Sequence, residues 1–254
     1  MKFPSRFACA ALLACAAIPA VAQTGNSTPY VYLISQVNQP WGQSTNEDAM
    51  NNILGSGNWV TQNYETVDPN ALLVSSTQFI FMEGGDSSFA GFQDFMNHNG
   101  AALYTWIYNG GRLLIMSAPN DPLVSATVYL PDNIVLRADS FYGSTSTLAY
   151  ATQYSNQIFH SPNSTSYVLT GDFVSHGYFT PGGNNQLLDL MQSDLGEVVL
   201  GYDLIGGGIM LYGGLTTDNF QLPQPAAHSF LENIVSYTVN VTLTPPTPPS
   251  TPGS

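Results

Sequence analysis

The fold of this chain is decided by residues 79–121, which read FIFMEGGDSSFAGFQDFMNHNGAALYTWIYNGGRLLIMSAPND. The apolar run at 79–82 is too short for a helix and ends at Gly84-Gly85, so it predicts a buried strand followed by a tight turn. Apolar residues spaced by three and four then predict a helix that ends at Gly110-Gly111. A second apolar run, at 113–116, predicts another strand. Strand, helix and strand together predict a βαβ unit with two parallel strands that are buried on both faces.

The remaining elements can be placed by working outward from this unit. Before it, the pattern predicts a strand at 30–34, a helix at 46–54, a more exposed strand at 59–64 and a short helix at 70–75. After it, the pattern predicts short strands at 126–129 and 133–137, an irregular insertion over 157–173, a hairpin of 198–202 and 208–212, and a final helix at 226–237. These elements predict one α/β domain, a three-layer flavodoxin-like fold with a mainly parallel central sheet.

Polar side chains gather where the two central strands end. Glu83 and Asp86 follow the first strand, and Ser117 follows the second. Ligands of open α/β sheets bind beyond the carboxyl ends of the strands, where loops and helix N-termini converge. The sequence therefore predicts a site at this edge. The predicted ligand-binding residues are Glu83, Asp86, Asn120, Asp121 and Asn219.

The first 22 residues have the pattern of a secretory signal. Lys2 and Arg6 precede an apolar run, and Ala20-Val21-Ala22 has the small-x-small form of a signal-peptidase site. Cleavage there leaves 254 − 22 = 232 residues, beginning at Gln23. The predicted organisation is a signal peptide (1–22), an N-terminal lead (23–29), the α/β domain (30–239) and a Pro/Thr-rich tail (240–254). We expect secretion to the periplasm, the cell surface or the medium, with no transmembrane anchor.

The charge and cysteine content exclude several classes of partner and chemistry. Cleavage leaves Arg112 and Arg137 against 17 acidic residues, a formal net charge of 2 − 17 = −15. Nucleic acids and anionic membrane surfaces are excluded as partners, because both require a basic surface. Cys9 and Cys15 both lie in the signal, so the mature chain has no disulfide, no thiolate metal site and no cysteine nucleophile.

The order of the elements resembles a known fold. Gly84-Gly85 follows the first central strand, residues 110–114 read GGRLL, residues 207–213 read GGIMLYG, and the closing helix contains NIVSY at 233–237. In this order and glycine placement the chain resembles the class I glutamine-amidotransferase-like fold, most closely its trehalose-utilisation (ThuA-like) members. Residues 213–220, GGLTTDNF, are also similar to a segment of secreted bacterial PEP-CTERM-type proteins, although this chain lacks their sorting helix and basic tail.

The resemblance implies a catalytic cysteine on a sharp turn after a central strand, relayed to a histidine and a carboxylate. Ser117 occupies the matching turn, which argues against glutamine hydrolysis. A serine hydrolase remains open, with Ser117 as nucleophile, His176 as base, and Asp218 or Glu83 as the orienting carboxylate. The alternative for Ser117 is structural, because a serine at a strand end commonly caps a turn. No G-x-S-x-G motif occurs in the chain.

The histidines and acidic residues contain no strong metal-binding motif. His98 and His228 lie in predicted helices without a second histidine four residues away, so we interpret both as surface or packing residues. Glu83, Asp86 and Asp121 offer oxygen ligands that suit Ca²⁺, but no EF-hand or D-x-D-x-D spacing is present. We therefore expect no metal and no cofactor, with Ca²⁺ as the one ion that these acids would suit.

Aromatic residues in Asn-rich surroundings suggest a carbohydrate-facing surface, because their rings can stack on sugars while amides bind hydroxyls. These residues are Trp41, Trp59, Tyr142, Tyr178 and Tyr212. Since the mature chain has no cysteine, nucleophile elbow or metal-ligand pair, the sequence favours a non-catalytic extracellular or cell-surface interaction domain. Its predicted partner is carbohydrate or another surface protein. The alternative is a secreted hydrolase or carbohydrate-modifying enzyme that uses Ser117 and His176, with Asp218.

Overall fold

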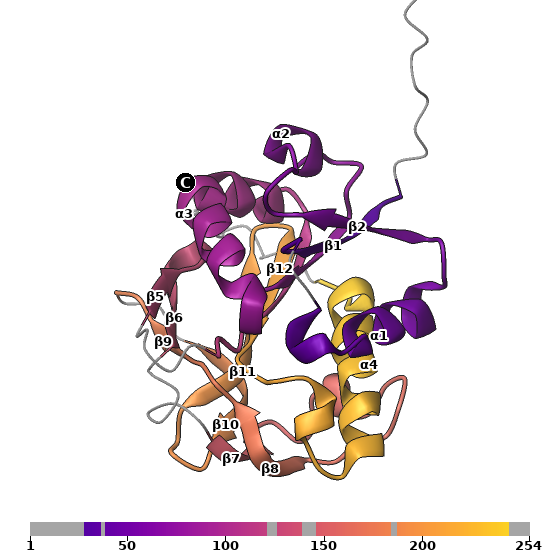
Figure 1. The fold of residues 1–254 in the computed structure, drawn as a ribbon, viewed down its shortest axis with the longest axis vertical. Helices are drawn as coiled ribbons and strands as arrows, with labels where there is room; N and C mark the ends of the chain where they lie inside the picture. The colour runs from indigo at the N-terminus through magenta and orange to yellow at the C-terminus, as the bar shows by residue number, and fades with distance from the viewer. Residues whose placement is uncertain (1–27, 37–38, 121–125, 139–145, 184–186, 244–254) are drawn as a thin grey trace, which may run out of the picture.

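The computed structural model describes residues 28–36, 39–120, 126–138, 146–183 and 187–243 (Figure 1). The signal peptide, Asp121, Tyr142 and the tail beyond residue 243 lie outside the described residues, so what the sequence predicts for them stays a prediction. No helix in the part of the chain that the structure describes has the length and apolar character needed to cross a membrane.

The first half of the described chain alternates strands and helices, and the second half consists mostly of strands. The first half contains β1 (Tyr30–Ile34), α1 (Thr45–Leu54), β2 (Trp59–Asn63), α2 (Pro69–Leu72), β3 (Phe79–Glu83), α3 (Phe89–Tyr108) and β4 (Arg112–Met116). The second contains β5 (Ala126–Tyr129), β6 (Ile134–Ala138), β7 (Ser146–Ala151), β8 (Val168–Ser175), β9 (Tyr178–Pro181), β10 (Leu188–Ser193), β11 (Val198–Ile205), β12 (Gly208–Gly213) and α4 (Gln224–Asn240). The 3-10 helices between them are η1 (Pro40–Gly42), η2 (Asp86–Ser88), η3 (Pro131–Asn133), η4 (Gln157–Phe159) and η5 (Asp218–Phe220).

Five neighbouring strands form the parallel part of the sheet, in the order β2-β1-β3-β4-β12. The predicted βαβ unit is confirmed, because β3 and β4 pair in parallel with Phe79 opposite Arg112 and Glu83 opposite Met116. β3 is buried along its whole length, which explains why its sequence is a continuous apolar run rather than an alternating one. Glu83, at the end of this strand, is the polar exception.

The prediction of a mainly parallel, three-layer flavodoxin-like fold is wrong. Beyond β12 the sheet continues as β11-β10-β7-β8, and among the described strands seven pairings are antiparallel and four are parallel. β12 joins the two parts, since it runs parallel to β4 and antiparallel to β11. The physical reason is that residues 126–193, of which only 126–129 and 133–137 are predicted as strands, contain six strands that pair antiparallel. Figure 1 shows β7, β8 and β10 at the end of the molecule opposite α2.

Helices cover both faces of the parallel strands (Figure 1). The apolar side of α3 belongs to one core cluster, and α1 and α4 contribute to a second cluster on the opposite face. Burial of one large side chain of α3, such as Phe92, contributes about 1.5–3 kcal/mol. The helix ends at Gly110, whose φ of +106° favours glycine. A Cβ on Gly111 would lie 2.4 Å from the Trp106 ring, so glycine is required for β4 to begin directly against the helix.

Candidate functional site

A narrow pocket lies at the carboxyl ends of β3 and β4, the edge where ligands of α/β sheets bind. Its polar and aromatic lining includes Trp41, Asn46, Glu83 and Asp218, and apolar side chains of α4 form another wall. Its volume is about 20 Å³, close to what one water molecule needs. The pocket thus brings two carboxyl groups, an amide and an indole ring around a space of water size.

Glu83 is a buried carboxylic acid at the end of β3, with only 3% of the residue exposed. The backbone N–H of Gly85 donates to its Oε1 at 2.6 Å, and the Asn46 amide donates to its Oε2 at 2.6 Å. Burial raises the pKa of Glu83 to about 8, although both hydrogen bonds favour the ionised form. At neutral pH the side chain therefore carries a proton, as a general acid must before reaction.

The groups around Glu83 suit both of its protonation states. The Asn46 amide also donates to the Tyr32 hydroxyl, at 3.1 Å. Rotating this amide by half a turn would present its oxygen, which can accept a hydrogen bond from protonated Glu83. The Tyr64 hydroxyl donates to the backbone carbonyl of Glu83 at 2.9 Å and fixes the end of the strand. Burial raises the pKa of both tyrosines well above its usual value, so both remain neutral.

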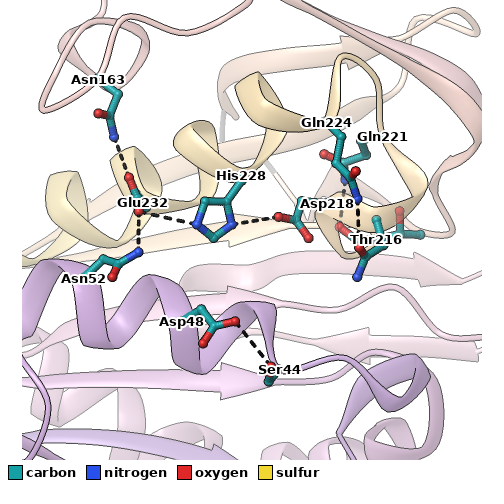
Figure 2. Close-up of polar contacts among 11 residues, drawn as sticks. Ser44, Asp48, Asn52, Asn163, Thr216, Asp218, Gln221, Gln224, His228 and Glu232 are labelled. Carbon is teal, nitrogen blue, oxygen red and sulfur yellow. Dashed lines mark hydrogen bonds and ion pairs between the residues drawn. The ribbon is translucent and has the colours of Figure 1, made fainter.

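A relay of side chains orients Asp218, the second carboxyl group of the pocket (Figure 2). Asp218 lies in η5 and is 5% exposed, and its Oδ2 lies 2.9 Å from Nδ1 of His228. Nε2 of His228 lies 3.5 Å from Oε1 of Glu232, one turn further along α4. The amides of Asn52 and Asn163 each donate to Glu232 at 2.7 Å. The relay therefore holds one oxygen of Asp218 and leaves Oδ1 without a partner.

Buried polar atoms without a hydrogen-bond partner concentrate around this pocket. Of the seven such atoms among the described residues, five belong to residues 39–47 and 217–218, the segments that contain Trp41, Asn46 and Asp218. They are Gln39 Oε1, Thr45 Oγ1, Glu47 Oε2, Thr217 Oγ1 and Asp218 Oδ1. A buried polar atom left unsatisfied costs about 1–3 kcal/mol. Such a concentration is typical of a place where water or a polar ligand binds.

The contacts of Ser117 and His176, the predicted nucleophile and base, are those of residues with a structural role. Ser117 is fully buried, and its Oγ donates to the backbone carbonyl of Gly84 at 2.8 Å. The His176 ring is 3% exposed and stacks on Trp41 and Phe173, with ring centres 6.3 and 5.7 Å apart. Burial lowers the pKa of His176, so the ring is neutral at pH 7. Neither residue lines the pocket, whereas Asp218 does and hydrogen-bonds His228.

The structure separates the predicted ligand residues. Asp86 Oδ2 accepts a hydrogen bond from the Trp41 backbone N–H at 3.0 Å and so holds the loop that carries this ring. Asn219 Oδ1 accepts a hydrogen bond from Gln224 at 2.9 Å, in the exposed turn before α4. Asn120 is half-exposed after β4, and Asp121 lies outside the described residues. Of the members of the predicted ligand set that the structure describes, only Glu83 lines the pocket.

Metal binding receives no support from the described residues. Among them, no group of three or more histidine, cysteine, aspartate or glutamate side chains is placed to hold a metal ion. The predicted Ca²⁺ ligands Glu83 and Asp86 lie near each other, but Glu83 is engaged by Asn46 and Gly85. With a pKa of about 8, Glu83 is protonated and poorly suited to a hard cation.

Three residues of the site, Asn46, His228 and Glu232, were not among the predicted site residues. A histidine and a glutamate at positions i and i+4 of a helix lie on the same face, so the pair His228 and Glu232 was visible in the sequence. Its connection to Asp218 depends on how η5 packs against α4, which no local pattern predicts. Of the predicted sugar-stacking aromatics, Trp41 lines the pocket, whereas Tyr212 is fully buried in the core.

Comparison with known proteins identifies no family. No family model matches the sequence, and no curated protein matches it. Among solved structures, the chain is similar to an exo-β-1,4-mannosidase from Opitutaceae bacterium strain TAV5, at 14% identity and a TM-score of 0.42, covering 83% of this chain and 34% of that one. It is similar to a β-galactosidase from Bacillus circulans sp. alkalophilus, at 10% identity and a TM-score of 0.47, covering 83% and 30%. A cytoplasmic protein from Salmonella typhimurium matches at 10% identity and a TM-score of 0.48, covering 83% and 97%.

The resemblance to class I glutamine-amidotransferase-like, ThuA-like proteins is wrong. Seven of the eleven strand pairings among the described residues are antiparallel, and beyond β12 the sheet continues through antiparallel strands. This chain spans about a third of the length of the two glycosidases. The glycines on which the resemblance rests are explained by close packing within this fold. A Cβ on Gly84 would lie 2.8 Å from the Phe92 ring, and one on Gly214 would lie 2.0 Å from the Gly177 carbonyl oxygen. No family model supports the likeness of residues 213–220 to PEP-CTERM-type proteins.

Proposed function

We propose that this chain is a carbohydrate-hydrolysing enzyme whose active site is the pocket between Glu83 and Asp218. The observation that carries the proposal is that two carboxyl groups with different environments line one pocket. Glu83 is buried, with a pKa raised to about 8, and Asp218 is oriented by His228 with one oxygen unpartnered. Two carboxyl groups held in different surroundings can divide the roles of acid and base between them.

In the proposed reaction, Glu83 gives its proton to the leaving-group oxygen of a glycosidic bond as that bond breaks. Asp218 accepts a proton from water, whose oxygen forms the new bond to the sugar carbon. The water-sized space beside these residues suits the attacking water. The Asp218–His228–Glu232 relay holds the base in position, as the third residue of a catalytic triad does.

The lining of the pocket also suits a neutral, hydroxylated substrate. No lysine or arginine is among the residues that line it, so it offers no partner to a phosphate or a carboxylate. Trp41 provides an aromatic face, and the unpartnered oxygens of Thr217 and Asp218 can accept hydrogen bonds from hydroxyl groups. This composition suits carbohydrate, one of the two kinds of partner that the sequence predicts.

A non-catalytic interaction domain is the second candidate, and the size of the pocket favours it. A volume of about 20 Å³ admits water but no sugar ring, so a sugar can bind in the pocket only if it widens. Export is expected for both candidate functions. It rests on the signal pattern of residues 1–22, and a mature chain beginning at Gln23 by intact-mass measurement would test it.

A screen of the full mature chain against aryl glycosides and neutral oligosaccharides tests the proposal. We expect Glu83→Gln and Asp218→Asn each to lower kcat by about 10²–10⁴-fold, the contribution of a positioned acid or base. Asp94→Asn is the control, because Asp94 is exposed on α3 and does not line the pocket. Turnover that survives both pocket substitutions would refute the assignment. Absence of turnover on every glycoside, with glycan binding retained, would favour the interaction domain.

A further inference from the structure

A second groove lies on the other side of the sheet, between α3 and residues 129–133, which comprise the end of β5 and η3. Its volume is about 610 Å³, within the range of about 300–1,000 Å³ that is typical of ligand sites. Tyr104 and Asn97 line it from α3, and Tyr129 and Asn133 line it from the facing segment. None of its lining residues belongs to the pocket at Glu83 and Asp218. Figure 1 shows α3 and β5 on the side of the molecule away from α1 and α4.

Three tyrosines are exposed along this groove and beside it. Tyr129 is 68% exposed, Tyr108 is 55% exposed and Tyr104 is 38% exposed. Tyr104 and Tyr108 are one helical turn apart, and their rings stack with centres 6.3 Å apart and planes 27° from parallel. Packing of the fold does not require such exposed rings. A row of tyrosines offers flat apolar faces with polar edges, the surface on which a sugar ring can stack.

The groove offers little net charge to a ligand. No lysine or arginine lines it, and besides its tyrosines the ionisable residues that line it are His98 and Asp132. His98 lies 3.4 Å from Asp94 on the same helix, and Asp132 shares a side-chain hydrogen bond with Asp203. The remaining polar groups include the amides of Asn97 and Asn133, which both donate and accept hydrogen bonds as sugar hydroxyls require. A neutral hydroxylated ligand fits this lining better than an anion or a peptide with basic residues.

The segment that carries Asn133 is held in one conformation. Asp132 and Asn133 both have positive φ, +57° and +59°, which costs non-glycine residues free energy. The Asn133 carbonyl accepts a hydrogen bond from the Gly182 backbone N–H at 2.6 Å. A Cβ on Gly182 would lie 2.2 Å from that carbonyl oxygen, so glycine is required for this contact. Strain held by close packing is typical of a preorganised binding surface.

We infer that the groove between α3 and η3 is a second carbohydrate-binding site, which takes a neutral oligosaccharide on Tyr104 and Tyr129. The inference goes beyond the proposed hydrolysis and does not depend on it. With an acidic chain, a polysaccharide that carries no negative charge approaches without repulsion. The site holds the chain on polysaccharide whether or not the pocket cleaves it.

Affinity gel electrophoresis of the full mature chain tests this inference. The probes are neutral galactomannan, xyloglucan and mixed-linkage β-glucan, with polygalacturonate as the charged probe. We expect at least one neutral polysaccharide to retard the chain. The double variant Tyr104→Ala/Tyr129→Ala should bind about tenfold more weakly, since two stacking rings are lost. The variant Tyr104→Phe/Tyr129→Phe keeps both rings and should retain most of the binding.

Two further variants establish whether the polysaccharide binds in this groove or elsewhere on the chain. Tyr154→Ala removes a tyrosine that is equally exposed, at 56%, but lies outside the groove, so its binding should match wild type. Glu83→Gln should keep polysaccharide binding whatever it does to turnover. Absence of retardation by every neutral polysaccharide, or equal retardation of wild type and the double alanine variant, would overturn the inference. Self-association that disappears in the double variant would also overturn it, in favour of a second copy of this chain as the occupant.

Discussion

Replacing Glu83 by glutamine should change how stability depends on pH, because Glu83 is a protonated acid in the folded chain. Its folded pKa of about 8 exceeds the ordinary value of 4.5 by 8 − 4.5 = 3.5 pKa units. One pKa unit corresponds to about 1.4 kcal/mol, so full ionisation of buried Glu83 costs about 5 kcal/mol. Glutamine has nearly the same shape and does not ionise, so Glu83→Gln removes this cost.

The direction in which the free energy of unfolding changes with pH follows from which state, folded or unfolded, holds the proton. Below pH 4.5 the folded and unfolded chains are both protonated at Glu83, and its favourable contribution is fully present. Between pH 4.5 and pH 8 only the folded chain keeps the proton, so the free energy of unfolding falls by about 1.4 kcal/mol per pH unit. Above pH 8 the folded side chain ionises as well, and the loss is complete.

Urea unfolding followed by tryptophan fluorescence at pH 5, 6, 7 and 8 measures this dependence. The difference in free energy of unfolding between wild type and Glu83→Gln should move by about 3 to 4 kcal/mol in favour of the variant over this interval. Asp94→Asn, an exposed change on α3, should leave the slope of wild type unaltered. Parallel curves for wild type and Glu83→Gln would show that Glu83 is ionised in the folded chain, and would refute its role as a proton donor.

Three other substitutions test the packing at Gly111, the role of Ser117 and the raised pKa of Asp203. Gly111→Ala should lower the free energy of unfolding by about 1–3 kcal/mol, because the added Cβ meets the Trp106 ring; Gly100→Ala, with open space around it, is the control in the same thermal unfolding assay. Ser117→Ala should lower stability by about 1–3 kcal/mol, since a buried carbonyl loses its donor, and should retain turnover. Lost turnover at unchanged stability would identify Ser117 as the nucleophile. Burial raises the pKa of Asp203 to about 7, so Asp203→Asn should remove a decline in stability between pH 4 and pH 7, and an unchanged urea midpoint profile would contradict this.

The sequence predicts the parallel part of the sheet well because burial acts there on whole segments. β3 and β4 are buried on both faces, so their apolar runs cannot be confused with surface segments. The antiparallel part gives a weaker signal. β8 alternates irregularly between buried and exposed positions and contains Gly171, which packs against the Phe220 carbonyl. A strand stabilised by such contacts with a distant segment has no local pattern that reveals it, because its partners are fixed only by the fold.

The sequence predicts where the candidate site lies but not which residues form it. The carboxyl ends of parallel strands share one edge of the sheet, so Glu83 could be assigned to the site from its position alone. Its chemistry depends on Asn46, 37 residues away, and on the apolar groups that bury it. Asp218 was predicted to orient His176, but α4 brings His228 to it instead. A carboxyl group becomes an acid or a base through the groups that long-range packing places beside it, and that information lies in the fold rather than in any local stretch of sequence.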